Sequence, residues 1–400
     1  MQFLKDISDV FIIELRRIRH DKGALLIFMI ATLLYPLIFG AIYKNEMVRN
    51  LPVAVVDDSD SEDSRRFIHK LDATPEINVD YHCCSMAEAQ RLMRERRING
   101  IVYFPNDYSE RLASLRTTRV CLFCDMSSFL YYRSVLTGAS GVLVDEMQDI
   151  QLKRYSLTGI TGERADELTQ PIPYDDVKLY SPGGGFTSFL VPALLVLVIH
   201  QTIFLGISII FGTAREEHTT LEAIPARLRR KHSWRVAWGR ALAYLVLYIP
   251  LVAIDLVLVP RLFGLPHIGR LGDLCLFLLP FLLATIFFCM TVCSFVRERD
   301  SGIVVCIFFS VVLLFISGAV WPQCNMPGVW RVLGAIFPST HGIQGFIRIN
   351  SMGATLPQVR YEYLALWLQT IVYFVTTCVI LRIKNGESNK LENKTPSVTL

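Results

Sequence analysis

The chain has 400 residues, of which 52% are apolar and only 19% are charged, and its formal net charge is +4. The apolar residues gather into long blocks, which is typical of a membrane protein and argues against a soluble globular chain. The positive charge does not indicate nucleic-acid binding, because it is unevenly distributed. Residues 44–178 hold 17 basic and 22 acidic side chains, and the cationic excess lies in the rest of the chain.

Residues 1–22 have helical spacing of their apolar side chains. These recur every three or four positions, at Leu4, Ile7, Phe11, Leu15 and Ile18. Asp6, Glu14 and Arg17 lie off that face. The pattern predicts an amphipathic helix in the headgroup plane of a membrane, and the alternative is a soluble helix packed on another element.

Six apolar runs are long enough to cross a bilayer, which takes roughly 20 residues at about 1.5 Å per residue. They are residues 23–43, 186–212, 236–260, 274–296, 302–320 and 363–381. The first run is too long for a signal peptide and no small-residue cleavage site follows it, so we expect it to be retained. Basic residues gather before the first run and after the second, fourth and sixth, which predicts that both termini are cytosolic.

Between the first two runs, residues 44–185 are numerous enough for a separate domain. Strand patterns at LPVAVVDDSDS, INVDYH, GIVYFP and RVCLFCDM alternate with helical patterns at 61–71, 86–97, 107–115 and 128–155. This order predicts a small mixed α/β sheet. We therefore predict an α-helical multi-pass membrane protein with six transmembrane helices and an inserted extracytoplasmic α/β domain.

The loop at 213–236, between the second and third runs, carries a possible helix start. Thr219 followed by Glu222 is a capping-box spacing, so the sequence predicts a short helix with Leu221 and Ile224 on one side, ended by Pro225. The basic stretch RLRRKHSWR behind it would lie against anionic headgroups. An ordinary basic loop with an incidental cap is the alternative.

This loop resembles the cytosolic loop in permease subunits of type-2 ATP-binding-cassette exporters. The matching residues of REEHTTLEAIP and WGRALAYL are Arg215, Glu216, Glu217, Thr220, Leu221, Glu222, Pro225, Gly239 and Arg240. Thr219 stands where the family usually has Gly, and Pro225 comes a few residues early. These departures put the details of the loop's contact with its partner in question.

Two further segments resemble the same family. In 317–361, the stretch SGAVWPQCNMPGVWRVLGAIFPSTHGIQGFIRI is similar to the segment after the family's fifth span. Its prolines and glycines predict broken or re-entrant helices, with a plain external loop as the alternative. The order of motifs in 44–185 is similar to the drug-efflux-like branch with a large external domain.

The resemblance implies a transport subunit that works with a second permease subunit, in a homo- or heterodimer, and with separate ATPase subunits. The residues implied to couple to the ATPase are Arg215, Glu216, Glu217, Thr219, Thr220, Leu221, Glu222, Ile224 and Pro225. No phosphate-binding loop of the G-x-x-x-x-G-K-[ST] type occurs, so we expect ATP and Mg²⁺ on the partner, no cofactor in this chain and no catalytic site. The implied setting is a bacterial cytoplasmic membrane, with a periplasmic adaptor as a possible further partner.

Polar residues inside the apolar runs are candidates for a translocation path, because they are unfavourable in a bilayer. These are His200, Gln201 and Asp255, to which we add Pro338 and His341 of the broken segment. Asp255 would suit a cationic cargo if it lies deep, but it could instead lie near the external interface. The polar tail 384–400 is expected to be disordered.

The ten cysteines leave several hypotheses open. Those in the runs suit apolar packing, whereas Cys83, Cys84 and the pair Cys121 and Cys124 could be free thiols, disulfides or weak zinc ligands. We predict no metal site. Two other functions also stay open, a receptor or scaffold whose α/β domain binds a ligand, and an ion-coupled secondary transporter that depends on Asp255 or His200.

Overall fold

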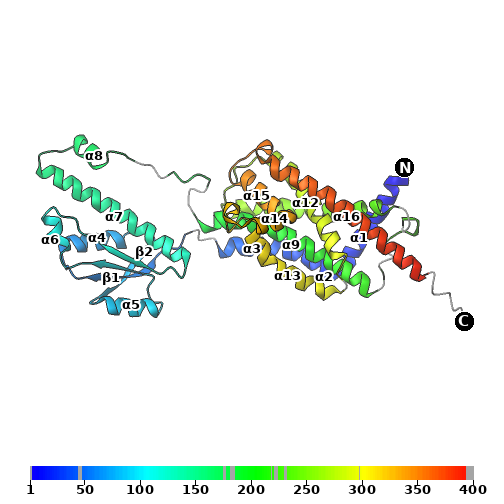
Figure 1. Ribbon diagram of the computed structural model, residues 1–400, viewed down its shortest axis with the longest axis horizontal. Helices are drawn as coiled ribbons and strands as arrows, with labels where there is room; N and C mark the ends of the chain where they lie inside the picture. The colour runs from blue at the N-terminus through cyan, green and yellow to red at the C-terminus, as the bar shows by residue number, and fades with distance from the viewer. Residues whose placement is uncertain are drawn as a thin grey trace. The chain divides into compact units, whose positions relative to one another are not determined.

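The structure is a computed structural model that describes residues 2–43, 47–173, 177–180, 185–217, 219, 224–228, 232–296 and 298–392. The chain divides into two compact units. We call Met1–Lys44 with Leu179–Leu400 the helical unit, and Asn45–Lys178 the sheet unit (Figure 1).

The sheet unit contains a four-stranded mixed sheet in the order β2-β1-β3-β4. Its strands are β1 (Leu51–Asp57), β2 (Ile77–Cys83), β3 (Gly100–Phe104) and β4 (Cys121–Cys124). β1 pairs in parallel with both β2 and β3, while β4 is antiparallel to β3. The small mixed sheet predicted from the sequence is confirmed.

Helices cover both faces of this sheet (Figure 1). The helices of the unit are α4 (Glu62–Asp72), α5 (Met86–Arg94), α6 (Tyr108–Ala113), α7 (Phe129–Leu157) and α8 (Glu163–Thr169). Side chains of a strand point alternately to its two faces, so Val53 and Val55 pack under α4 and α7 whereas Ala54 and Val56 pack under α5. α4 begins with a capping box in which Ser61 accepts from the backbone of Ser64 at 3.2 Å.

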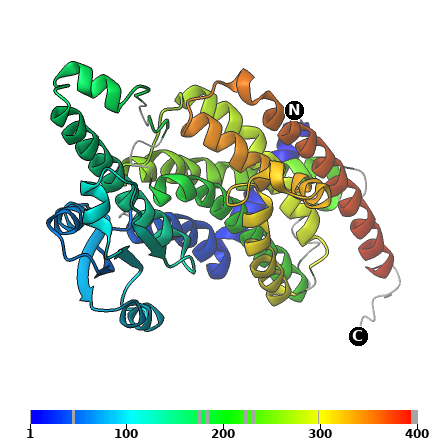
Figure 2. The same cartoon turned by 60° about the vertical axis from the view of Figure 1, so that its left-hand side comes forward.

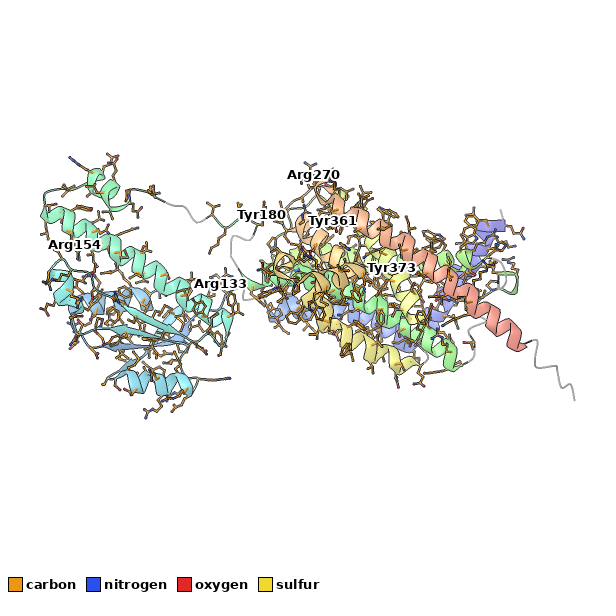
Figure 3. The ribbon with its side chains drawn as sticks, viewed as in Figure 1. Arg133, Arg154, Tyr180, Arg270, Tyr361 and Tyr373 are labelled. Carbon is orange, nitrogen blue, oxygen red and sulfur yellow. The ribbon has the colours of Figure 1, made fainter. Side chains whose placement is uncertain are left out.

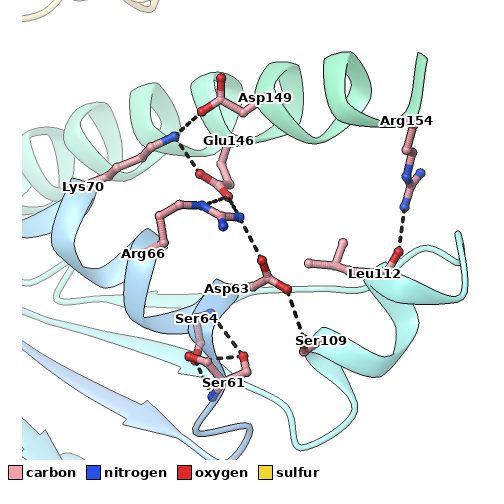
Figure 4. Close-up of polar contacts among 10 residues, drawn as sticks. All are labelled: Ser61, Asp63, Ser64, Arg66, Lys70, Ser109, Leu112, Glu146, Asp149 and Arg154. Carbon is pink, nitrogen blue, oxygen red and sulfur yellow. Dashed lines mark hydrogen bonds and ion pairs between the residues drawn. The ribbon is translucent and has the colours of Figure 1, made fainter. Parts of the chain in front are cut away.

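A buried carboxylate joins α7 to α4 (Figure 4). Glu146 is 1% exposed and accepts hydrogen bonds from Arg66 at 2.6 Å and Lys70 at 2.7 Å. Lys70 also bonds Asp149 at 2.5 Å. Burial by itself would raise the pKa of Glu146, but the hydrogen bonds and charges of Arg66 and Lys70 outweigh it and hold that pKa below its usual value.

Six helices of the helical unit are long and apolar enough to cross a membrane, among the described residues. They are Lys22–Ile42, Phe186–Glu216, Ser233–Leu262, Leu271–Cys293, Arg299–Ile316 and Leu356–Lys384. The first comprises α2 (Lys22–Leu25), the π-helical turn η1 (Leu26–Ala31) and α3 (Thr32–Ile42); the second is α9. The third comprises α10 (Ser233–Ala253), the π-helical turn η3 (Ile254–Leu258) and α11 (Val259–Leu262).

α9 (Phe186–Glu216) and α12 (Leu271–Cys293) form the centre of the bundle, with 83% and 72% of their most apolar stretches buried. By contrast, 22% of the corresponding stretch is buried in α13 (Arg299–Ile316) and in the last span. The latter lies largely in α16 (Arg360–Glu392), which runs along the outside of the bundle (Figure 2). The poorly buried helices present apolar side chains outward, as expected in lipid.

The segment between α13 and the last span is broken into short helices, as its prolines suggest. These are η4 (Gln323–Asn325), α14 (Gly328–Ile336), α15 (Pro338–Asn350) and η5 (Leu356–Val359). Tyr373 on α16 (Figure 3) donates its hydroxyl to the carbonyl of Ile336 at 2.5 Å, which ties the end of α14 to the bundle. α16 itself continues to Glu392, past residue 384, where the sequence predicts that the disordered tail begins.

Candidate functional site

Two residues just before the predicted coupling helix are bonded to other spans. Arg215, in the last turn of α9, donates to the carbonyl of Ser294 at 2.5 Å, just after α12. Glu216 accepts from the backbone N–H of Arg299, the first residue of α13, at 2.8 Å. The end of α9 is therefore linked to the ends of α12 and α13.

The helix expected at 219–224 lies mostly outside the described residues, including Thr220, Leu221 and Glu222. Thr219 is described, and its hydroxyl accepts from Arg17 at 3.1 Å. Ile224 is 2% exposed and belongs to the core of the helical unit, and Pro225 is partly buried. The loop is thus attached to the helical unit at both of its described ends.

The helix α1 (Gln2–His20) packs along α10 through acidic side chains. Asp6 is 2% exposed and pairs with Arg235 at 2.6 Å and with Arg227 at 3.0 Å. Arg227 lies in η2 (Ala226–Leu228) of the loop, and it also pairs with Asp9. The first helix of the chain therefore holds the second half of the loop.

Glu14, two turns further along α1, is 0% exposed. It accepts from the hydroxyl of Tyr244 at 2.6 Å, and its other oxygen lies 3.4 Å from Nε of Arg240. Gly239 allows this close packing, because a Cβ there would lie 2.7 Å from the Cβ of Val10. α1 can approach α10 only because no side chain stands at that position.

These contacts show how α1 is oriented on the helical unit. The apolar spacing predicts an amphipathic helix in the headgroup plane, with a helix packed on another element as the alternative. Asp6 and Glu14 are buried against α10, so the polar side of α1 packs on another element, whereas Leu4 is 69% exposed on the outside of the unit and is free to contact lipid. The sequence signal for this packing is the four-residue spacing of Val10, Glu14 and Ile18, which are all buried on one side of α1. That side lies against α10, which carries two arginines.

A polar cavity of about 430 Å³ lies where α1, the start of α2, the end of α9 and the start of α13 meet. Basic side chains line it at Arg17, His20, Lys22 and Arg299, and acidic ones at Asp21 and Glu217. Asp21 caps α2 through the N–H groups of Gly23 and Ala24, at 2.9 and 3.0 Å. Burial lowers the pKa of the Arg17 guanidinium from its usual value, although the neighbouring Glu14 opposes that shift.

A sequence comparison identifies the family. Residues 22–379 match the family described as ABC-2 family transporter protein. The chain belongs to the ABC-2 transporter family. No curated protein matches it in a search.

Family membership places this ABC-2 protein among multi-pass membrane permeases, which are the transport components of their complexes and are not themselves catalytic. The family implies an ABC ATPase as partner and a membrane as setting. The segments that resemble the family in sequence, including Arg215, Glu216 and Arg240, all lie inside the matched region.

The candidate translocation residues do not form one group. His200 and Gln201 line a pocket between α9, α12 and α13 that also includes Phe337, next to Pro338. His341 is mostly buried on α15 and lies 3.3 Å from the carbonyl of Ala335.

Asp255 is 0% exposed in η3 and lines neither the polar cavity nor the pocket at His200. Neither of its oxygens has a hydrogen-bond partner among the described residues. It lies seven residues before the end of its span at Leu262, so both a deep position and one near the external interface stay predictions.

All ten cysteines are free. Within the described parts of the chain, no three His, Cys, Asp or Glu side chains stand close enough to hold a metal ion. Cys83 ends β2, at the opposite edge of the sheet from Cys121 and Cys124 on β4, so it cannot pair with them. Cys121 and Cys124 stand three positions apart on one strand, which directs their side chains to opposite faces.

Proposed function

We propose that this ABC-2 protein is the permease subunit of an exporter, which moves an amphiphilic small molecule, drug or lipid across a bacterial cytoplasmic membrane. A separate ATPase subunit, which binds ATP and Mg²⁺, supplies the energy. A second permease subunit completes the pathway. Family membership and the six apolar helices support the proposal.

The proposed topology has both termini and the loop 213–236 in the cytosol and the sheet unit outside. The charge distribution supports this topology. Basic residues gather before the first span and after the second, fourth and sixth, whereas residues 44–178 carry a net negative charge. α1 and the polar cavity then lie at the cytosolic surface, where an ATPase can reach them. An external adaptor would bind the sheet unit.

One observation supports the coupling proposal: the first part of the loop, at Arg215, Glu216 and Thr219, is bonded at the same time to α1, to the residue after α12 and to the start of α13. A partner that pushes on the loop would therefore move the ends of several spans together. Glu216 is the most direct link, because its carboxylate caps the first N–H of α13. Coupling of this kind typically amounts to about 1–3 kcal/mol.

The test reconstitutes the chain with its ATPase in vesicles and measures both hydrolysis and export of a fluorescent amphiphile. We expect Glu216→Ala to lower the amount exported per ATP hydrolysed by about fivefold or more, because the cap on α13 is lost. Glu216→Gln keeps an acceptor oxygen and should retain most coupling, and Glu163→Ala in the sheet unit is the distant control. Export that persists after ATP depletion, with the ion gradient maintained, would identify a secondary transporter instead.

A further inference from the structure

A second cavity lies inside the bundle and differs from the cytosolic one in being almost wholly apolar. Its volume is about 230 Å³, and it lies between α9, α12, α13 and the junction of α14 with α15. Among the lining residues there is no charged side chain. His200 and Gln201 stand near the midpoint of α9, so the cavity is deep in the proposed membrane region.

Four phenylalanines shape this cavity: Phe204, Phe288, Phe309 and Phe337. The ring centroids of Phe288 and Phe337 are 5.6 Å apart, and those of Phe309 and Phe337 are 6.0 Å apart. Phe204 and Phe288 are buried, whereas Phe309 on α13 is 39% exposed. The aromatic lining is therefore open towards the outer surface at α13.

His200 is a fully buried polar group of this cavity that lacks a partner among the described residues. It is 2% exposed, and neither of its ring nitrogens has a hydrogen-bond partner among the described residues. Its ring lies 5.7 Å from that of Phe288. A buried polar group without a partner is unfavourable by about 1–3 kcal/mol, so such groups call for an explanation.

We propose that this cavity binds an uncharged aromatic molecule of one or two rings that carries one hydroxyl or carbonyl group, and that His200 forms the hydrogen bond to that group. The imidazole offers one donor and one acceptor, which matches either group. The four phenylalanines would stack on the rings of the ligand. The size follows from the volume, because an apolar cavity of about 150 Å³ holds benzene.

The charge of the ligand follows from the lining. A cation would meet no carboxylate in this cavity, and burial of an unpaired charge is strongly unfavourable. Asp255, a carboxylate buried within the third span, is absent from the lining. A lipid acyl chain would fill the apolar space but would leave His200 without a partner. As an assignment of cargo class, the inference rests on the exporter function proposed above.

The experiment measures binding to the purified full chain in detergent, without any ATPase, by equilibrium dialysis. The probes are 2-naphthol, naphthalene and trimethyl(2-naphthyl)ammonium, which share one ring system and differ in their polar group. We expect 2-naphthol to bind up to about tenfold more tightly than naphthalene, the effect of one net hydrogen bond. We expect the ammonium probe to bind most weakly.

His200→Phe should bring the affinity for 2-naphthol down to that for naphthalene, while naphthalene binding stays within about twofold. Phe309→Trp, which fills the entrance, should weaken both neutral probes and serves as a second variant if His200→Phe does not fold. Equal binding of the neutral probes to the wild type, or tightest binding of the cation, overturns the inference. A preference for 2-naphthol that neither variant changes also overturns it, because the site would then lie elsewhere.

The proposed binding site and the proposed exporter function can be disproved independently of each other. If 2-naphthol binds as expected but is not exported in the ATPase assay, the site stands and the cargo assignment falls. If an ATP-driven exporter shows no preference between the neutral probes, the exporter function stands and the site falls.

Discussion

Two regions of the helical unit bury ionisable side chains almost completely but surround them differently. At the interface of α1 with α10, Glu14 is 0% exposed and has both Arg240 and the hydroxyl of Tyr244 as partners. In the aromatic cavity, His200 is 2% exposed and has none among the described residues. Burial is therefore common to both regions, and the presence of partners distinguishes them.

This difference distinguishes a contact that stabilises helix packing from a candidate ligand-binding site. A buried charge with hydrogen-bonded partners fixes how two helices pack, and removal of one partner leaves the other uncompensated. A buried polar group without a partner weakens the folded protein unless a ligand supplies the missing bond. Substitutions should accordingly have opposite signs in the two regions.

The largest effect is expected for Arg240→Ala, which leaves the carboxylate of Glu14 buried without its counter-charge. We predict a loss of about 3–5 kcal/mol of stability, measured by thermal unfolding of the chain in detergent. Arg227→Ala is the control, because Arg227 is 42% exposed and Asp6 keeps Arg235, so its effect should be at most about 1 kcal/mol. Equal losses for the two variants would show that burial of the pair is unimportant.

A smaller effect is expected for another buried acid, Glu146 in the sheet unit. Its pKa in the folded chain is below the usual value of 4.5, so its contribution to stability is present above that pH and is lost as the pH falls through the folded value. Hydrogen exchange of α4 and α7 in the full chain, corrected for intrinsic rates, should therefore accelerate between about pH 5 and pH 3. The acceleration should be weaker in Glu146→Gln. An unchanged pH dependence in that variant would assign the effect to other carboxyls such as Asp149.

The smallest effect has the opposite sign. His200→Phe removes an unpaired buried polar group beside an open cavity, so we predict a gain of about 1 kcal/mol in the same thermal assay. The matched control is Thr202→Val, two residues away, whose hydroxyl already bonds the carbonyl of Val198 at 2.9 Å and which should give no gain. A loss of stability in His200→Phe would mean that the imidazole has a structural role.

Much of the fold follows from local pattern. Apolar runs near 20 residues predict all six long helices to within a few residues, apart from the last, which begins seven residues earlier than its apolar run. Alternation and turn residues predict the four strands, because β1 to β4 each depend on short-range sequence. The broken helices α14 and α15 follow from Pro327 and Pro338, which restrict the backbone locally.

The candidate sites are less predictable because their contacts join distant segments. Glu14 and Tyr244 are 230 positions apart, and helical spacing alone does not reveal which face of α1 meets another helix. His200 stands out as a polar residue in an apolar run, but the phenylalanines around it come from three helices and the junction of α14 with α15. Family resemblance points to the loop that we propose couples to an ATPase, whereas the bonds of Arg215 and Glu216 near α12 and α13 are visible only in the structure.

The central claim is that the charged end of the helical unit faces the cytosol, where a nucleotide-hydrolysing partner can act on the loop. Cysteine labelling tests it directly in a background in which the ten native cysteines are replaced. A membrane-impermeant maleimide should label Ser127→Cys, in the sheet unit, in intact spheroplasts, and should label Glu217→Cys only after the membrane is permeabilised. Labelling of Glu217→Cys in intact spheroplasts, with Ser127→Cys protected, would contradict the account.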